Sequence, residues 1–167
     1  NKLYRRDWFV SCGFRYPTML YEDVPVTMPV FERADSIDIF SETMYYWFIR
    51  DINGDKSITN NRTDIKNFSD RMVAIRSAVE VLKTNIRALQ EYEYKVLHMD
   101  LAIYLRHFLN VDENYKNILS TEISWALNEF SPISLKSIPN RELKRLQCAA
   151  RGDWEKLRTF YEEEELA

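Results

Sequence analysis

Apolar and polar side chains alternate along the first part of the chain. Five apolar residues, each two positions apart, would share one face of an extended segment: Trp8, Val10, Cys12, Phe14 and Tyr16. This period of two is typical of a half-buried β-strand. A second alternation over residues 24–30 carries prolines at positions 25 and 29, whose missing N–H groups would face the same sheet edge. The pattern predicts an N-terminal β-hairpin or extended arm over residues 1–34.

A helical spacing replaces the alternation after residue 34. Apolar residues three or four apart predict a helix that starts at a cap on Asp35 or Ser36 and runs through residue 48. After a loop, apolar positions 68, 72, 75, 79, 82, 86 and 89 follow an a/d heptad pattern. This seam continues to residue 103, so residues 64–109 form either one helix or two. We favour a break near Glu91–Lys95, because residues 96–109 are apolar on several faces.

The C-terminal part predicts shorter helices. One spans residues 115–130, residues 131–139 form a loop, and helices over 141–151 and from 154 to about 161 are separated by Gly152. Residues 146–161, with Ala149-Ala150, Gly152-Asp153 and Leu157, resemble the helix-turn-helix opening of an ankyrin-type unit. The unit occurs once and cannot form a repeat array alone, so we interpret it as a helical hairpin.

These elements predict a mainly α-helical fold. We expect a single-domain helical bundle of about six helices, one of them long and heptad-patterned, with an N-terminal β-hairpin or extended arm. The expected parts are the arm over residues 1–34, a helical core over residues 35–130, and a C-terminal helical hairpin with an acidic tail over residues 131–167.

Composition and charge exclude several protein classes. The chain has 167 residues, of which 46% are hydrophobic, and a formal net charge of −3. A chain of this length can hold a core without disulfides, so Cys12 and Cys148 are interpreted as small buried hydrophobic residues. No apolar run approaches the roughly 20 residues of a membrane span, and the first residues are polar. We expect a soluble, cytoplasmic protein without membrane contact.

The sequence contains no recognisable catalytic motif. Three glycines in the whole chain leave little room for a phosphate-binding loop or a nucleophile elbow. His98 and His107 are nine residues apart and lie on opposite helix faces, so they cannot share a metal from one helix. We therefore predict that the protein is not an enzyme and uses no cofactor. A hydrolase built from scattered carboxylates is a third alternative, after two binding functions.

A loop at residues 51–59 resembles the start of an EF-hand calcium loop. The resemblance covers nine residues, but the sequence departs from the pattern at position 6, where lysine replaces glycine, and at position 12, where Arg62 replaces the bidentate glutamate. We therefore predict a turn held by its own side chains, without tight calcium binding. The weak candidate ligands are Asp51, Asn53, Asp55 and Thr59.

Aromatic residues are concentrated before residue 50 and give the first functional hypothesis. Aromatic and arginine side chains dominate interface hot spots. We therefore expect a non-enzymatic interaction or regulatory protein that docks on a larger protein assembly. The candidate partner-binding residues are Tyr4, Arg5, Arg6, Trp8, Tyr45 and Tyr46.

A basic cluster near the C-terminus gives the alternative. It would suit a nucleic-acid-associated accessory factor, such as a phage-type factor acting on transcription or replication machinery. The net acidic charge and the glutamates at 162–165 oppose this function. The cluster comprises Lys136, Arg141, Lys144, Arg145 and Arg151. Another basic stripe, interleaved with glutamates, is interpreted as a solvated helix face, and comprises Arg62, Lys66, Arg76, Lys83, Arg87 and Lys95.

Overall fold

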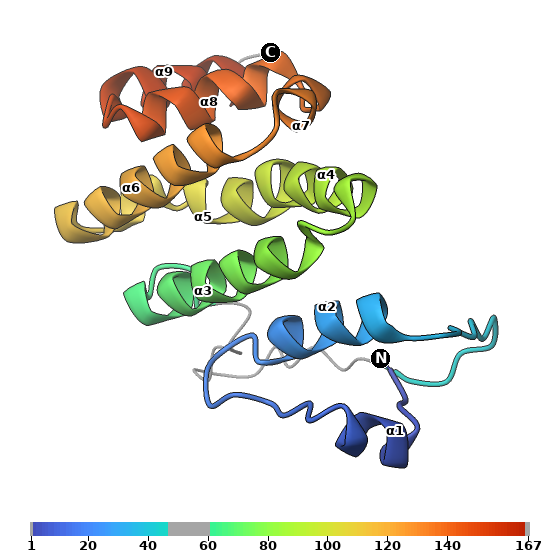
Figure 1. The fold of residues 1–167 in the computed structure, drawn as a ribbon. Coiled ribbons are helices and arrows are strands. Elements are labelled where there is room, and N and C mark those ends of the chain that lie inside the picture. Colours follow the sequence, from blue (N-terminus) through green and yellow to red (C-terminus); the bar gives the residue numbers. More distant parts are fainter. Residues whose placement is uncertain (1, 47–60, 166–167) are drawn as a thin grey trace.

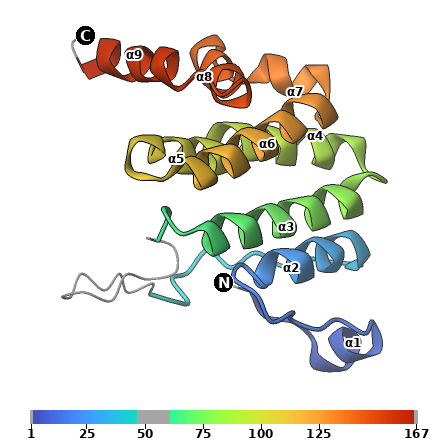
Figure 2. The same cartoon turned by 90° about the vertical axis from the view of Figure 1, so that its left-hand side faces the viewer.

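The computed structural model describes residues 2–46 and 61–165, and the regular secondary structure in these ranges is helical. Figures 1 and 2 show that the helices lie in layers that broadly follow the chain order, from α2 near one end to α8 and α9 at the other. The prediction of a mainly α-helical fold is confirmed. The elements are α1 (Arg6–Ser11), α2 (Asp23–Arg33), α3 (Ile65–Leu82), α4 (Ile86–Lys95), a π-helical segment (Val96–Leu101), α5 (Ala102–Leu105), a 3₁₀ turn (Phe108–Asn110), α6 (Glu113–Glu129), α7 (Pro132–Ser137), α8 (Asn140–Ala150) and α9 (Trp154–Glu165).

The hydrophobic core lies between the central layers. It is built from apolar faces of α3, the π-helical segment, α5, α6 and α8, and α9 contributes Leu157. α2 packs on the outer side of α3 through Val26 and Val30, which are 2% and 4% exposed. The largest fully buried side chains are Tyr104, Tyr115, Phe68, Met72, Ile75, Leu97, Leu101, Leu105, Leu119, Ile123, Leu146 and Leu157.

The heptad seam is correct along α3 and is interrupted after it, although Tyr92 and Val96 further along are buried. Phe68, Met72, Ile75 and Leu82 are buried as predicted, but Ile86 is 61% exposed. The helix ends at Leu82, and the Asn85 side chain accepts a hydrogen bond from the backbone N–H of residue 88 to start α4. Asparagine at this position favours a new helix start over continuation of the old one. Residues 64–109 therefore form more than one helix, and the break lies at residues 83–85 rather than 91–95.

The prediction of N-terminal strands is wrong, because the first segment contains the helix α1 up to Ser11 and the second lies within α2. The valines of α2 that alternate with other residues include Val26 and Val30. These two are four residues apart, so they lie on the same face of a helix. Pro25 lies in the first turn, where its missing N–H has no intrahelical partner to lose. α1 ends at Ser11, and Gly13 beyond it has a φ of +73°, which suits the left-handed position after a helix. Backbone hydrogen bonds from Gly13 to Val10 and from residue 14 to residue 9 close this end.

The helix predicted from residue 35 to 48 is also wrong over its described part. Residues 34–46 carry no helix, and Ile37, Phe40 and Met44 are 58%, 67% and 70% exposed. An amphipathic helix in a protein is stabilised mainly by burial of its apolar face. That burial is missing here, so the spacing alone does not produce a helix. Positions 47 and 48 lie outside the described residues.

The C-terminal helices match the sequence prediction more closely. α6, α8 and α9 lie where helices are expected, but the predicted loop 131–139 contains α7, which begins with a Ser131 cap and Pro132 at its first position. α8 ends at Ala150, and Gly152 beyond it has a φ of +69° and donates to the carbonyl of residue 149. Asp153 then caps α9 by accepting from the backbone N–H of residue 156. α8 and α9 contact each other across this turn.

Candidate functional site

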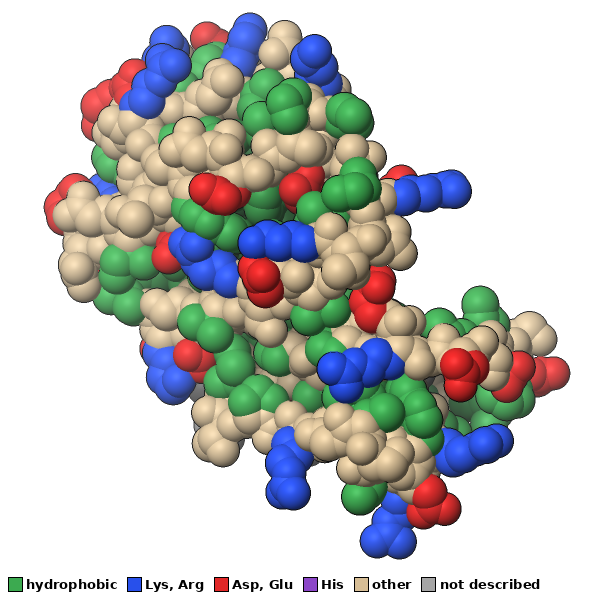
Figure 3. All heavy atoms as spheres, viewed as in Figure 1, with side chains coloured by type: hydrophobic (Ala, Val, Ile, Leu, Met, Phe, Trp, Pro, Cys, Tyr) green, Lys and Arg blue, Asp and Glu red, His purple; other side chains and the backbone are tan. Residues whose placement is uncertain are grey.

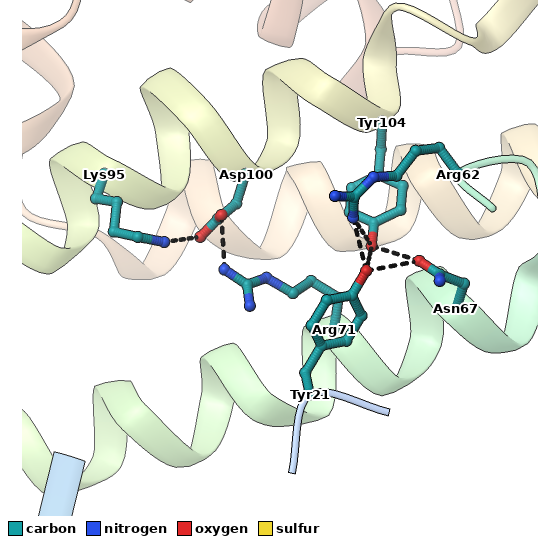
Figure 4. Close-up of polar contacts among 7 residues, drawn as sticks. All are labelled: Tyr21, Arg62, Asn67, Arg71, Lys95, Asp100 and Tyr104. Carbon is teal, nitrogen blue, oxygen red and sulfur yellow. Dashed lines mark hydrogen bonds and ion pairs between the residues drawn. The ribbon is translucent and has the colours of Figure 1, made fainter. Parts of the chain in front are cut away.

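A polar cleft lies where the segment before α2 meets α3 and α5. Tyr21 comes from the loop before α2, Arg62 precedes α3, and Tyr104 comes from α5 (Figure 4). The cleft has a volume of about 310 Å³. Its lining combines phenols, guanidinium groups and carboxylates with one aliphatic side chain. The lining residues are Tyr21, Asp23, Arg62, Arg71, Asp100, Ile103 and Tyr104.

Two phenol groups and one amide form a closed network at the base of the site (Figure 4). Tyr21 Oη and Tyr104 Oη donate to Asn67 Oδ1 over 2.9 and 2.7 Å. Arg62 Nη1 donates to the same two phenol oxygens, over 2.6 Å to Tyr21 and 3.0 Å to Tyr104. The amide oxygen has two lone pairs and each phenol has one proton. Asn67 can therefore accept both protons while Arg62 satisfies both phenol oxygens.

Two tyrosines around Arg62, Tyr104 and Tyr115, remain protonated. Burial, followed by the Tyr21 hydroxyl, whose oxygen lies 2.9 Å from Tyr104 Oη, raises the pKa of Tyr104 well above its ordinary value. Burial likewise raises the pKa of Tyr115, whose hydroxyl donates to the backbone carbonyl of Arg62 over 2.6 Å. This bond fixes the backbone of Arg62 while the two other phenols hold its guanidinium. The network therefore acts as a set of neutral hydrogen-bonding groups around one cation.

A second group of charges is centred on Asp100. Its carboxylate binds Arg71 Nη2 and Lys95 Nζ, each at 2.7 Å. Burial would lower the pKa of Arg71, but the charge and hydrogen bond of Asp100 outweigh it and raise that pKa. Asp100 lies in the π-helical segment Val96–Leu101, and such widened turns often occur at functional sites. Here the turn holds a carboxylate against two cations.

The segment before α2 is anchored on this site at two places. Tyr21 has a φ of +64°, a left-handed conformation that costs a non-glycine residue about 1–3 kcal/mol. Its ring lies against the Arg71 guanidinium, 4.9 Å from ring centre to Cζ. The backbone N–H of Leu20 donates to Asp70 Oδ2 over 2.9 Å. The strained turn therefore serves to bring a phenol from the N-terminal segment onto α3.

The side chains of the site can contact a ligand through charge and hydrogen bonds. Guanidinium and ammonium groups with neutral phenols suit binding of an anionic or polar group. Within the described ranges, no group of three or more histidine, cysteine, aspartate or glutamate side chains is placed to hold a metal ion.

The predicted partner-binding residues divide between two environments. Tyr4 and Trp8 are half-buried in an aromatic cluster, in which Tyr4 stacks on Phe9 at 5.2 Å and Trp8 packs edge-on against Phe14 at 5.6 Å. The other four predicted residues, Arg5, Arg6, Tyr45 and Tyr46, are exposed. The rings of Tyr4 and Trp8 therefore help to fold the segment around α1, and Tyr45 and Tyr46 face solvent.

The predicted nucleic-acid residues gather at the opposite end of the stack. Lys136 lies on α7, and three members lie on α8 at positions 141, 144 and 145, which share one helix face. The Arg145 guanidinium is half-buried and lies 4.3 Å from the centre of the Tyr161 ring. The exposed members are Lys136, Arg141, Lys144 and Arg151.

Other predicted features have mixed outcomes. The weak metal candidates Asp51, Asn53, Asp55 and Thr59 lie outside the described residues. Cys148 is buried as predicted, and Cys12 is only half-buried. The basic stripe is not one solvated face, because α3 ends within it and three of its members are engaged elsewhere. Arg62 lies in the cleft, Lys95 binds Asp100, and Arg76 binds Glu122 at 2.6 Å.

Sequence reasoning missed most of the cleft. Tyr21, Arg71, Asp100 and Tyr104 come from four segments, and no spacing along the chain links them. One signal was present: Asp100 is a carboxylate within the strongly apolar stretch 96–105. A buried carboxylate requires a cationic or hydrogen-bonding partner, so this residue predicts a polar site without naming its members.

No known family model matches the chain, and no curated protein or solved structure shows significant similarity to it. Among the described residues, no helix is both long and apolar enough to cross a membrane.

Proposed function

We propose that this chain is a non-enzymatic interaction protein that binds a partner protein through apolar side chains of its first 46 residues. The observation that supports this function is the distribution of exposed large hydrophobic residues. Of fifteen such residues in the described ranges, ten lie between Leu3 and Tyr46. Figure 3 shows hydrophobic side chains on the part of this face that projects at lower right, where Figure 1 places residues 34–46.

Residues 37–46 are the centre of this surface. Six of these ten residues are large and hydrophobic, with exposed fractions between 58% and 92%. Aromatic side chains bury about 150–250 Å² each when covered, so Phe40, Tyr45 and Tyr46 alone present roughly 400 Å². That is about half of the roughly 800 Å² that each partner buries in a standard interface. A partner with an apolar groove fits this surface.

The test compares two sets of exposed apolar residues in the full chain. The test variant carries Ile39→Ser, Phe40→Ser and Tyr46→Ser, at positions 92%, 67% and 84% exposed. The partner is first recovered by affinity capture from the native cell, identified, purified, and titrated against each variant by calorimetry. The control variant carries Val73→Ser, Leu109→Ser and Ile133→Ser, at positions 54%, 54% and 61% exposed.

We expect the test variant to weaken binding of the purified partner by at least about a hundredfold, because removal of anchor side chains costs about 1–2 kcal/mol or more each. The control variant should bind as the wild type does. Equal loss in both variants, or no loss in the test variant, would refute this docking surface.

The second candidate function is association with nucleic acid through α7 and α8. It is favoured by the exposure of Lys136, Arg141, Lys144 and Arg151 at one end of the stack. Phosphate contacts release counterions, so such binding should weaken steeply between about 50 and 300 mM salt. Binding through apolar anchors should depend only weakly on salt. A steep slope that a triple alanine variant at positions 141, 144 and 145 abolishes would favour this alternative.

A further inference from the structure

We propose that the cleft between Tyr21 and Tyr104 binds a small carboxylate, and that the Arg62 guanidinium is its principal ligand. This inference is independent of the partner-binding function proposed above. It rests on the volume of the cleft, on the charge balance of its lining, and on the way in which Arg62 is held.

The size of the cleft suits a small molecule. Its volume of about 310 Å³ lies at the lower end of the roughly 300–1,000 Å³ that is usual for ligand sites. The tyrosine rings at positions 21 and 104 and the Ile103 side chain supply apolar walls. Polar groups from Arg62, Arg71 and Asp100 stand among these walls, as they do in sites that fix the orientation of a ligand.

The cations of the site differ in whether a carboxylate is paired with them. Arg71 and Lys95 both bind Asp100. Arg62 donates through Nη1 to two neutral phenol oxygens, and it forms no ion pair with any carboxylate among the described residues. A guanidinium has five N–H donors, and Nη1 carries only two of them. Within the part of the chain that the structure describes, Nε and Nη2 of Arg62 have no carboxylate partner, and we infer that they are the donors for an anionic ligand.

The Arg62 guanidinium is also held in position. Its Cζ lies 5.1 Å from the centre of the Tyr104 ring, its Nη1 binds two phenols, and its backbone carbonyl accepts from Tyr115. A planar guanidinium fixed in this way can bind both oxygens of a carboxylate with little further loss of side-chain freedom. The site is therefore preorganised around one edge of Arg62.

The other charges of the lining favour a carboxylate over phosphate. Asp23 lies on the same cleft, and its carboxylate would repel the second negative charge that phosphate carries near neutral pH. A singly charged carboxylate avoids this repulsion. A ligand that also carries an amine or hydroxyl group could donate a hydrogen bond to Asp23, which is exposed at the cleft. Small amino acids and hydroxy acids combine these features.

The test is a titration of the full chain followed by NMR of arginine Nε–Hε groups. The probes are acetate, lactate, malate, alanine and glutamate, with inorganic phosphate as the competing anion. The Arg62 signal is identified by its absence in Arg62→Gln. Arg62→Lys keeps the positive charge but removes the planar guanidinium group. Arg87→Gln is the control, because Arg87 is exposed and lies outside the cleft lining.

We expect at least one carboxylate to shift the Arg62 signal saturably, with a dissociation constant in the millimolar range, and to bind more tightly than phosphate. Followed by the Nε–Hε signal of Arg71, which lines the same cleft, Arg62→Gln should weaken binding at least tenfold, Arg62→Lys by several-fold, and Arg87→Gln not at all. If Arg62→Gln fails to fold, the wild-type titration and Arg62→Lys decide the outcome. Three results would overturn the proposal: no saturable shift by any carboxylate up to about 50 mM, unchanged binding in the Arg62 variants, or tighter binding of phosphate.

Discussion

Removal of the two phenol hydroxyls that share Asn67 gives the sharpest test of the network. Tyr21→Phe and Tyr104→Phe each delete one hydroxyl and keep the ring. After either change, Asn67 Oδ1 still accepts from the remaining phenol, and Arg62 still donates to it. Each single variant should therefore lose about 1 kcal/mol of unfolding free energy, the net value of a neutral hydrogen bond.

The double variant should lose more than the sum of the two single variants. Asn67 is 1% exposed, and the double change removes both phenol donors from its carbonyl oxygen. It also removes both phenol acceptors from Arg62. Loss of the partners of a buried polar group costs about 1–3 kcal/mol. We therefore expect a total loss of roughly 3–4 kcal/mol, with a coupling free energy of about 1–2 kcal/mol between the two sites.

The measurement is urea denaturation of the four proteins of the cycle, followed by circular dichroism. A slope of about 2 kcal/mol per molar urea converts a loss of 1 kcal/mol into a midpoint shift of roughly 0.5 M. Tyr92→Phe is the matched control, because Tyr92 is 7% exposed and its hydroxyl finds no partner among the described residues. This variant should be as stable as the wild type or more stable. A coupling free energy below about 0.3 kcal/mol would refute the shared-acceptor reasoning.

Three further predictions concern stability. Leu82→Ala should lower the free energy of unfolding by about 2–5 kcal/mol. Ile86→Ala, at a position 61% exposed, should lower it by less than about 0.5 kcal/mol. Equal losses in urea denaturation would contradict the helix break between α3 and α4. Gly152→Ala should lower the thermal midpoint by a few degrees, because φ is +69° and this conformation costs alanine about 1 kcal/mol; an unchanged midpoint would contradict the strain. Lys66 lowers the pKa of Asp70 below 3.8 in the folded protein, so the stability lost in Asp70→Ala should be constant above about pH 5 and shrink as pH falls through the folded pKa. A stability difference that grows on acidification would reverse this sign.

The sequence predicts helices best where burial and spacing agree. Along α3 the apolar spacing coincides with a covered face, and Gly152 and Asp153 mark the turn between α8 and α9 by their own backbone and capping preferences. The same spacing fails at residues 37–44, because a pattern of side chains does not say whether another surface covers them. In α2, apolar residues two positions apart include pairs four positions apart, so the same pattern fits a strand or a helix. The prolines favoured the strand, which was the wrong prediction.

The cleft is predictable from sequence only in part. Asp100 is conspicuous as a carboxylate in an apolar stretch, but its partner Arg71 is 29 residues away and resembles any charged residue on a helix. Tyr21 reaches the site because the backbone takes a left-handed turn, which tyrosine rarely adopts. Long-range pairing and strained conformations depend on the folded chain as a whole, so local patterns do not reveal them.

The stacking of helices in chain order also bears on how the protein opens. α2 packs mainly on α3, and α3 packs on α4 as well, so α2 lies near the edge of the array and α3 inside it. Edge units of such arrays detach with a smaller free energy than the units they cover. Amide hydrogens of α2 should therefore exchange with solvent through local detachment, and those of α3 and α6 only through wider unfolding. Detachment of α2 also separates Tyr21 from Asn67. The cleft therefore stays intact only as long as α2, the least protected layer that contributes to it, remains packed on the array.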